Sequence, residues 1–163
     1  MNLSDDVFSI IAKFLRGIGL PVETGEIDHP TFLPGIHIDA GVLRVDPAKL
    51  AWPGDLLHEA GHLALLTEQG RKAAQGNVGD DGGDELGAIA WSYAAAVHLR
   101  LNPAVVFHEG GYQGGGRSML ENFAEGRYLG LPMLQWRGLC VDEKNARTVG
   151  VGPYPHMLRW LRE

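Results

Sequence analysis

The chain has very little cysteine, with Cys140 as the only one in 163 residues. No internal disulfide can form, so the disulfide frameworks that stabilise small secreted domains are excluded. Residues 1–20 carry acidic side chains near their start and an apolar run that Lys13 and Arg16 interrupt, a pattern that matches neither a signal peptide nor a membrane span. We therefore expect a cytoplasmic protein.

Positive charge is also scarce. The sequence has 14 Lys and Arg against 20 Asp and Glu, for a formal net charge of −6, and none of its basic residues forms a dense run. Binding to a phosphate backbone requires clustered cations. We expect no nucleic-acid partner, and no membrane partner because a spanning apolar stretch is missing.

Length and composition predict one globular domain over residues 1–163. The apolar fraction of 45% and the charged fraction of 21% are ordinary, whereas 23 glycines are about twice the usual share and predict Gly-rich loops. The elements described below predict a mostly helical α+β fold, with a small antiparallel hairpin before the central helix.

Hydrophobic periodicity predicts the elements of the first half of the chain. Apolar residues at three- and four-residue intervals predict an amphipathic helix within residues 1–20, and alternation predicts a hairpin over residues 35–46. Pro53 and Asp55 favour the start of an apolar helix that ends near Thr67. Residues 68–83 show no hydrophobic period and predict a polar loop.

The second half begins with another apolar, Ala-rich helix, for which Asp84 is the predicted cap and Leu99 the approximate end. A short helix is predicted after Asn102. Ser118, with Glu121, predicts a capping box at the start of a longer helix. A last short helix is predicted over residues 156–161.

The first of the two apolar helices carries His58-Glu59-Ala60-Gly61-His62, which matches the HExxH pattern of zinc hydrolases. Residues four apart lie on one face of a helix, so His58 and His62 can direct two imidazole nitrogens at one metal ion. Glu59 then lies beside the metal, where it can accept a proton from water. The alternative is a pair of core histidines with ordinary hydrogen bonds, but isolated charge in so apolar a helix is costly unless it is paired or bound to a metal.

A catalytic zinc site needs a third protein ligand. The extended metzincin arrangement is excluded, because Leu65 stands where that motif requires glycine. Glu85 is the predicted third ligand, since its helix can fold back against the first one. His98 lies on a different side of that helix. Five other residues stay open as alternatives: Asp80, Asp81, Asp84, His108 and Glu109.

Two histidines, one glutamate and a base next to the first histidine are the chemistry of metal-assisted amide hydrolysis. The developing oxyanion needs a hydrogen-bond donor. Tyr112 and His108 are the two candidates, because both lie in a Gly-rich segment that can approach the metal.

Residues 35–99, with a hairpin, the HExxH helix and a second helix carrying Glu85, resemble the ImmA/IrrE-like group of small gluzincin zinc metallopeptidases. The resemblance implies zinc bound by His58, His62 and Glu85, with Glu59 as the base, and a protein or peptide as the substrate. The alternative interpretation is a non-catalytic, metal-stabilised interaction or regulatory protein.

Overall fold

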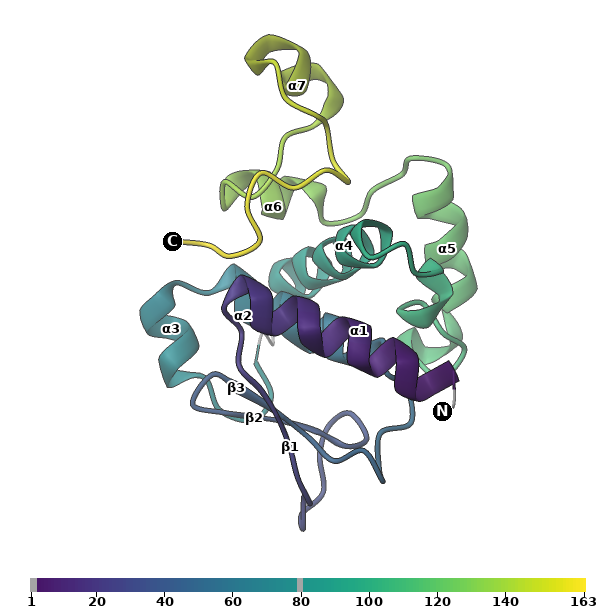
Figure 1. The fold of residues 1–163 in the computed structure, drawn as a ribbon. Helices are drawn as coiled ribbons and strands as arrows, with labels where there is room; N and C mark the ends of the chain where they lie inside the picture. The colour runs from purple at the N-terminus through teal and green to yellow at the C-terminus, as the bar shows by residue number, and fades with distance from the viewer. Residues whose placement is uncertain (1–2, 79–80) are drawn as a thin grey trace.

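The helix that carries the HExxH motif, α2 (Asp55–Leu65), lies in the middle of the hydrophobic core. The computed structural model describes residues 3–78 and 81–163. All residues of α2 except His58 are buried. Its main partner is α4 (Gly82–His98), which packs alongside it (Figure 1). A helix that is apolar on nearly every side belongs inside a domain, as the sequence predicts.

The α+β class is confirmed: a small mixed sheet precedes a mostly helical remainder. Within the described part of the chain, no helix has the length and apolar character that a membrane span requires. The other elements are α1 (Leu3–Ile18), β1 (Val22–Thr24), β2 (Ile36–Asp39), β3 (Val42–Val45), α3 (Glu68–Ala73), the 3-10 helices η1 (Pro103–Val105) and η2 (Tyr112–Gly114), α5 (Gly116–Ala124), α6 (Leu131–Trp136) and α7 (Glu143–Val149).

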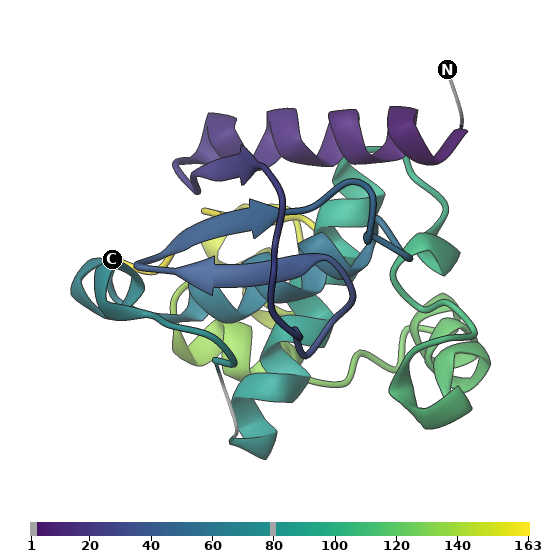
Figure 2. The same ribbon diagram turned by 90° about the horizontal axis from the view of Figure 1, so that it is seen from below.

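The sheet has the strand order β1-β3-β2 and lies against one side of the helices (Figure 2). β2 and β3 form the predicted antiparallel hairpin, with Ile38 opposite Leu43. β1, which the sequence analysis did not predict, pairs parallel to β3. At the outer edge of β2, the Gly76 N–H donates to the Ile38 carbonyl at 2.8 Å, so a following segment covers the end of that edge.

Small residues bring α2 and α4 unusually close together. A Cβ atom on Gly61 would lie 2.9 Å from the Ala88 carbonyl oxygen, and one on Gly87 would lie 2.8 Å from a methyl carbon of Leu65. Both distances are below van der Waals contact, so a larger residue at either position would push the helices apart.

Two predictions in the middle of the chain are wrong. The segment predicted as a loop from residue 68 contains α3, whose cap is Thr67, with a hydroxyl that accepts from the Gly70 N–H. The cap of α4 is Asp81 rather than Asp84, because the Asp81 carboxylate accepts from the Gly83 N–H.

In the second half, Asn102 caps η1 through the Ala104 N–H, as predicted. The predicted Ser118 capping box is wrong, because α5 begins at Gly116 without a side-chain cap. Residues 156–161 form bends and irregular backbone rather than the predicted helix. Before them, α7 projects from the rest of the molecule (Figure 1).

Arginine side chains satisfy the carbonyl groups at the end of α2. Arg137 and Arg162 donate to the Leu65 carbonyl at 3.4 and 3.2 Å, and the Arg162 N–H donates to the Ala64 carbonyl at 2.9 Å. Arg71 donates to the next carbonyl, that of Leu66, at 2.7 Å. These donors meet the negative end of the helix dipole, which cations stabilise.

Candidate metal centre

The motif residues converge on one side of α2. The Nε2 atoms of His58 and His62 are 3.1 Å apart, with the two rings nearly perpendicular. One ligand atom from each of His58, Glu59 and His62 lies within 4.8 Å of the others. This group of side chains could hold a metal ion, which is the chemistry that the HExxH spacing predicts.

α4 brings Glu85 to the same point. Its Oε1 lies 3.2 Å from His58 Nε2 and its Oε2 lies 3.0 Å from His62 Nε2. Glu85 is in the first turn of α4, three residues before Ala88, whose main chain lies against the glycine of the motif with no room for a side chain between them. The tight packing therefore brings this carboxylate to the histidine pair.

The spacing of these atoms suits a small tetrahedral ion. Ligands about 2.0–2.1 Å from a zinc ion at tetrahedral corners lie about 3.3 Å from one another. The observed separations are similar: 3.1 Å between the two Nε2 atoms, 3.2 Å from His58 Nε2 to Glu85 Oε1, and 3.0 Å from His62 Nε2 to Glu85 Oε2. After a slight opening, these side chains could hold a metal ion of that size.

The remaining ring nitrogens of the two histidines differ. Ligand histidines usually make an orienting hydrogen bond through the other nitrogen. His58 Nδ1 has such a contact, with the Tyr112 hydroxyl at 3.4 Å. His62 Nδ1 is buried and, among the described residues, has no hydrogen-bond partner. Within residues 3–78 and 81–163, His58 is thus the one histidine of the pair with an orienting contact from outside the cluster.

The protonation of the cluster follows from its pairing. The hydrogen bonds from His58 and His62 hold the pKa of Glu85 well below its usual range. Burial disfavours the charged form of His58, but its hydrogen bond to Glu85 and the nearby carboxylates outweigh this effect and raise its pKa. Without a metal, contacts of 3.2 and 3.0 Å between the imidazoles and the Glu85 carboxylate hold the group together. A divalent cation would replace the proton that now holds these groups together.

Glu59 has a different environment from Glu85. It is 7% exposed, and burial raises the pKa of its carboxyl, while positive charge on His62 and His58 opposes that rise in part. The Glu85 side chain is 43% exposed, so the cluster opens to solvent on that side. A carboxylate whose pKa moves toward neutrality becomes a better proton acceptor.

Tyr112 lies over the cluster in a strained backbone. Its φ is +55° and that of Gln113 is +53°, in the left-handed region that costs a non-glycine residue about 1–2 kcal/mol. Burial, followed by the negative charges of Glu85 and Asp55, raises the pKa of the Tyr112 hydroxyl far above neutrality. The hydroxyl therefore keeps its proton and can donate a hydrogen bond.

His108, the other predicted oxyanion donor, pairs with a different residue. Its Nε2 lies 2.6 Å from Asp55 Oδ1, and its Nδ1 accepts from the Gly110 N–H at 3.1 Å. Asp55 was predicted to cap α2, but no side-chain hydrogen bond caps that helix, and the carboxylate faces His108 instead. No local sequence pattern indicates this pair, because the two residues are 53 positions apart in the chain.

The other candidates for a third ligand have separate roles. Asp81 caps α4, and Asp84 pairs with Arg137 at 2.9 Å. His98 packs with Phe14 and Trp160 in an aromatic cluster. Two more residues complete the set of alternatives: Glu109 is exposed, and Asp80 lies outside the described residues.

A cavity of about 170 Å³ adjoins His58 and Glu85. Its walls include Tyr112 and two apolar residues that the sequence analysis did not identify, Phe32 and Leu33. Phe32 lines this cavity and is 76% exposed.

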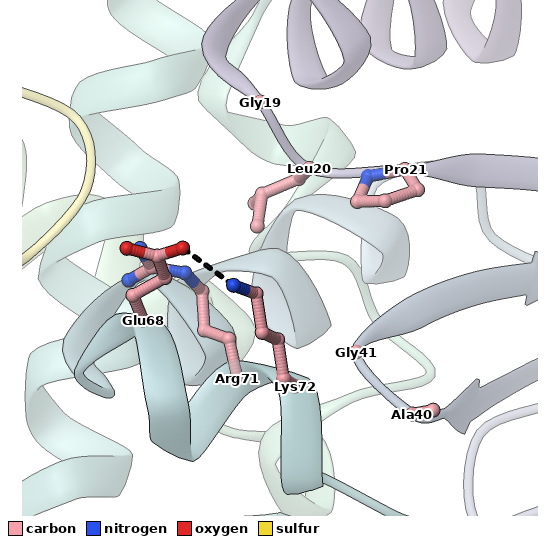
Figure 3. A pocket seen from close by; sticks show the side chains of 8 residues that line it. All are labelled: Gly19, Leu20, Pro21, Ala40, Gly41, Glu68, Arg71 and Lys72. Atoms are coloured by element: carbon pink, nitrogen blue, oxygen red, sulfur yellow. Dashed lines mark hydrogen bonds and ion pairs between the residues drawn. The ribbon is translucent and has the colours of Figure 1, made fainter.

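A different pocket, of about 290 Å³, lies between the start of β1, the β2–β3 turn and α3 (Figure 3). Its charged groups already have partners: Lys72 pairs with Glu68 at 2.6 Å, and Arg71 donates to backbone carbonyls. We assign no chemistry to this pocket.

No protein-family model matches this sequence, and comparisons with curated proteins and with solved structures likewise found no match.

Proposed function

We propose that this protein is a zinc-dependent metallopeptidase. The observation that carries the proposal is the convergence of His58, His62 and Glu85 at separations of 3.0 to 3.2 Å, with Glu59 beside them. Three protein ligands with an open fourth position are typical of a catalytic rather than a structural zinc site. The resemblance of residues 35–99 to the ImmA/IrrE-like gluzincins supports the same activity.

Each residue of the site has a task in amide hydrolysis. When bound, zinc supplies Lewis-acid polarisation of the substrate carbonyl and makes water more acidic. His58, His62 and Glu85 hold the ion. Glu59 accepts a proton from the attacking water and passes it to the leaving amine, a task for which its raised pKa suits it.

Tyr112 is the better candidate for the oxyanion donor. If His58 held the metal through the ring nitrogen that faces Glu85, its Nδ1 would carry the proton and could donate it to the Tyr112 hydroxyl oxygen, 3.4 Å away. The hydroxyl proton is then free to point at the substrate. Catalysis by His108 stays a prediction, and its contacts favour it less because both ring nitrogens already have partners.

The proposed substrate is a polypeptide. A cavity of about 170 Å³ is smaller than the roughly 300–1,000 Å³ that small-molecule sites commonly occupy. It would hold one side chain of a longer chain that crosses the exposed side of the cluster, near Phe32. The net charge of −6 argues against a polyanionic substrate.

Metal analysis is the first test. We expect one zinc per chain in the wild type and loss of zinc from His58→Ala and Glu85→Ala. The control His98→Ala, which removes a histidine outside the site, should keep its zinc. Equal zinc in all four proteins, or none in the wild type, would refute the metal site.

The second test separates an enzyme from a metal-stabilised scaffold. Glu59→Gln should keep its zinc but hydrolyse an unfolded protein substrate about 10²- to 10⁴-fold more slowly, because the general base is missing. In the cobalt-substituted protein, azide should change the visible spectrum, since a catalytic site has an open position. A spectrum that azide leaves unchanged, together with no turnover by the wild type, would favour the scaffold.

A further inference from the structure

We propose that Asp55 and His108 are a positioning pair that holds Tyr112 against His58. The inference rests on the proposed function for its catalytic consequence, but the geometry stands on its own. His108 and Asp55 are both buried, and their side chains are 2.6 Å apart. Asp55 is the first residue of α2, one helical turn before His58.

The hydrogen bonds of His108 fix its tautomer. Its Nδ1 accepts from the Gly110 N–H, so the proton of the neutral ring is on Nε2, which donates to the Asp55 carboxylate. The imidazole thereby joins the start of the motif helix to the backbone two residues before Tyr112. A short hydrogen bond to a charged acceptor is among the stronger contacts a buried side chain makes.

Packing around His108 leaves little freedom to this segment. Trp52 stacks on the imidazole, with ring centroids 4.3 Å apart and planes 6° from parallel. A Cβ on Gly110 would lie 2.6 Å from Trp52 Nε1, and one on Gly111 would lie 3.3 Å from His108 Cε1. The two glycines therefore lie directly on the Trp52–His108 stack.

The strain at Tyr112 explains why an anchor is needed. Tyr112 and Gln113 have φ values of +55° and +53°, a conformation that persists only when its surroundings impose it. The turn brings the Tyr112 hydroxyl to 3.4 Å from His58 Nδ1. Without the Asp55–His108 contact, the segment can relax to ordinary backbone angles and carry the hydroxyl away from the cluster.

A readout that requires neither metal nor activity tests this placement. The chain has four tyrosines, so 3-fluorotyrosine labelling gives four fluorine resonances, and Tyr112→Phe identifies the one of interest. We expect this resonance to move to the position of free fluorotyrosine in Asp55→Ala and His108→Ala. His108→Gln should restore the wild-type position, because its amide can donate to Asp55 and accept from Gly110.

The matched control is Tyr154→Phe, which removes a buried hydrogen bond of 2.7 Å to the Ala90 carbonyl. It should destabilise the fold and leave the Tyr112 resonance in place. An unmoved resonance in both Asp55→Ala and His108→Ala, when those proteins are folded, would overturn the proposal. An equal movement in the control would do the same.

Kinetics of the zinc-loaded protein give the second readout. Asp55→Ala and His108→Ala should each lower kcat about 10- to 100-fold, the usual effect of losing a residue that orients a group at a metal site, with little change in KM. Adding Tyr112→Phe to either should lower kcat no more than about twofold further, because all three act through one hydroxyl.

If the loss of kcat in a double variant equals the product of the losses in its two single variants, the proposal is overturned. A wild type without turnover would count against the proposed function alone, since the fluorine resonances still report where Tyr112 lies.

Discussion

Replacing Gly61 with alanine should separate the two helices that form the cluster. The new Cβ would lie 2.9 Å from the Ala88 carbonyl oxygen, 3.1 Å from its Cα and 3.3 Å from its carbonyl carbon. All three are main-chain atoms of α4, so no flexible side chain can yield, and the helices must move apart by a few tenths of an ångström. Glu85, one turn earlier on α4, moves with them.

Two opposing effects set the size of the change. Overpacking a well-packed core costs about 1–3 kcal/mol. Replacing glycine with alanine within a helix stabilises the helix by about 1 kcal/mol. We therefore expect Gly61→Ala to lower the free energy of unfolding by about 1 kcal/mol net, and to weaken zinc binding because the Glu85 carboxylate recedes from the histidines.

The control for this prediction is Gly17→Ala in α1, where a new Cβ would have no atom within 4 Å. This variant should gain up to about 1 kcal/mol from helix propensity alone. Urea unfolding of the metal-free proteins measures both changes, and a zinc titration against a competing chelator measures the affinity. If Gly61→Ala is stabilised as much as Gly17→Ala, the close contact of α2 with α4 does not exist as described.

Two further predictions concern other parts of the chain. The Ile27 N–H donates to the Asp46 carboxylate at 3.1 Å, and this hydrogen bond is the largest cause of the lowered pKa of Asp46. Asp46 therefore stabilises the fold above its unfolded pKa of about 3.9, and this stabilisation is lost as pH falls through the lower pKa of the folded state. Asp46→Asn should therefore be less stable than the wild type near pH 6, and urea unfolding should show that gap narrowing below about pH 4; a constant gap would contradict the assignment. Burial raises the pKa of the Cys140 thiol to about 12. The folded protein should therefore resist a thiol reagent at about pH 8 and react only when unfolded in urea. Rapid labelling of the folded protein would refute the burial of Cys140.

Local sequence patterns predict the parts of the fold that depend on local rules. The two central helices are long apolar runs that begin after turn and cap residues, the hairpin alternates apolar and polar residues, and all three form. β1 has three residues and a parallel partner distant in sequence, so no local pattern indicates it. α3 buries none of its residues and has no hydrophobic period, so its local signals are the cap at Thr67 and the Glu68–Lys72 pair four residues apart.

The candidate site shows the same division. The helix period places His58 and His62 on one face, and the sequence predicts both. Glu85 also lies beside them, although its role as a ligand stays a prediction. The partner of His108 could not be predicted, because the fold alone brings Asp55 to it.

The arginines that donate to the end of α2 affect how this helix folds during synthesis. Arg137 is 72 residues and Arg162 is 97 residues from the Leu65 carbonyl to which they donate. During synthesis, the motif helix therefore leaves the ribosome long before these donors exist, and its last carbonyls must bind water until they arrive. A nascent chain that stops short of Arg162 should therefore have a frayed last turn of α2, which gains its full set of donors only when Arg137 and Arg162 pack against it.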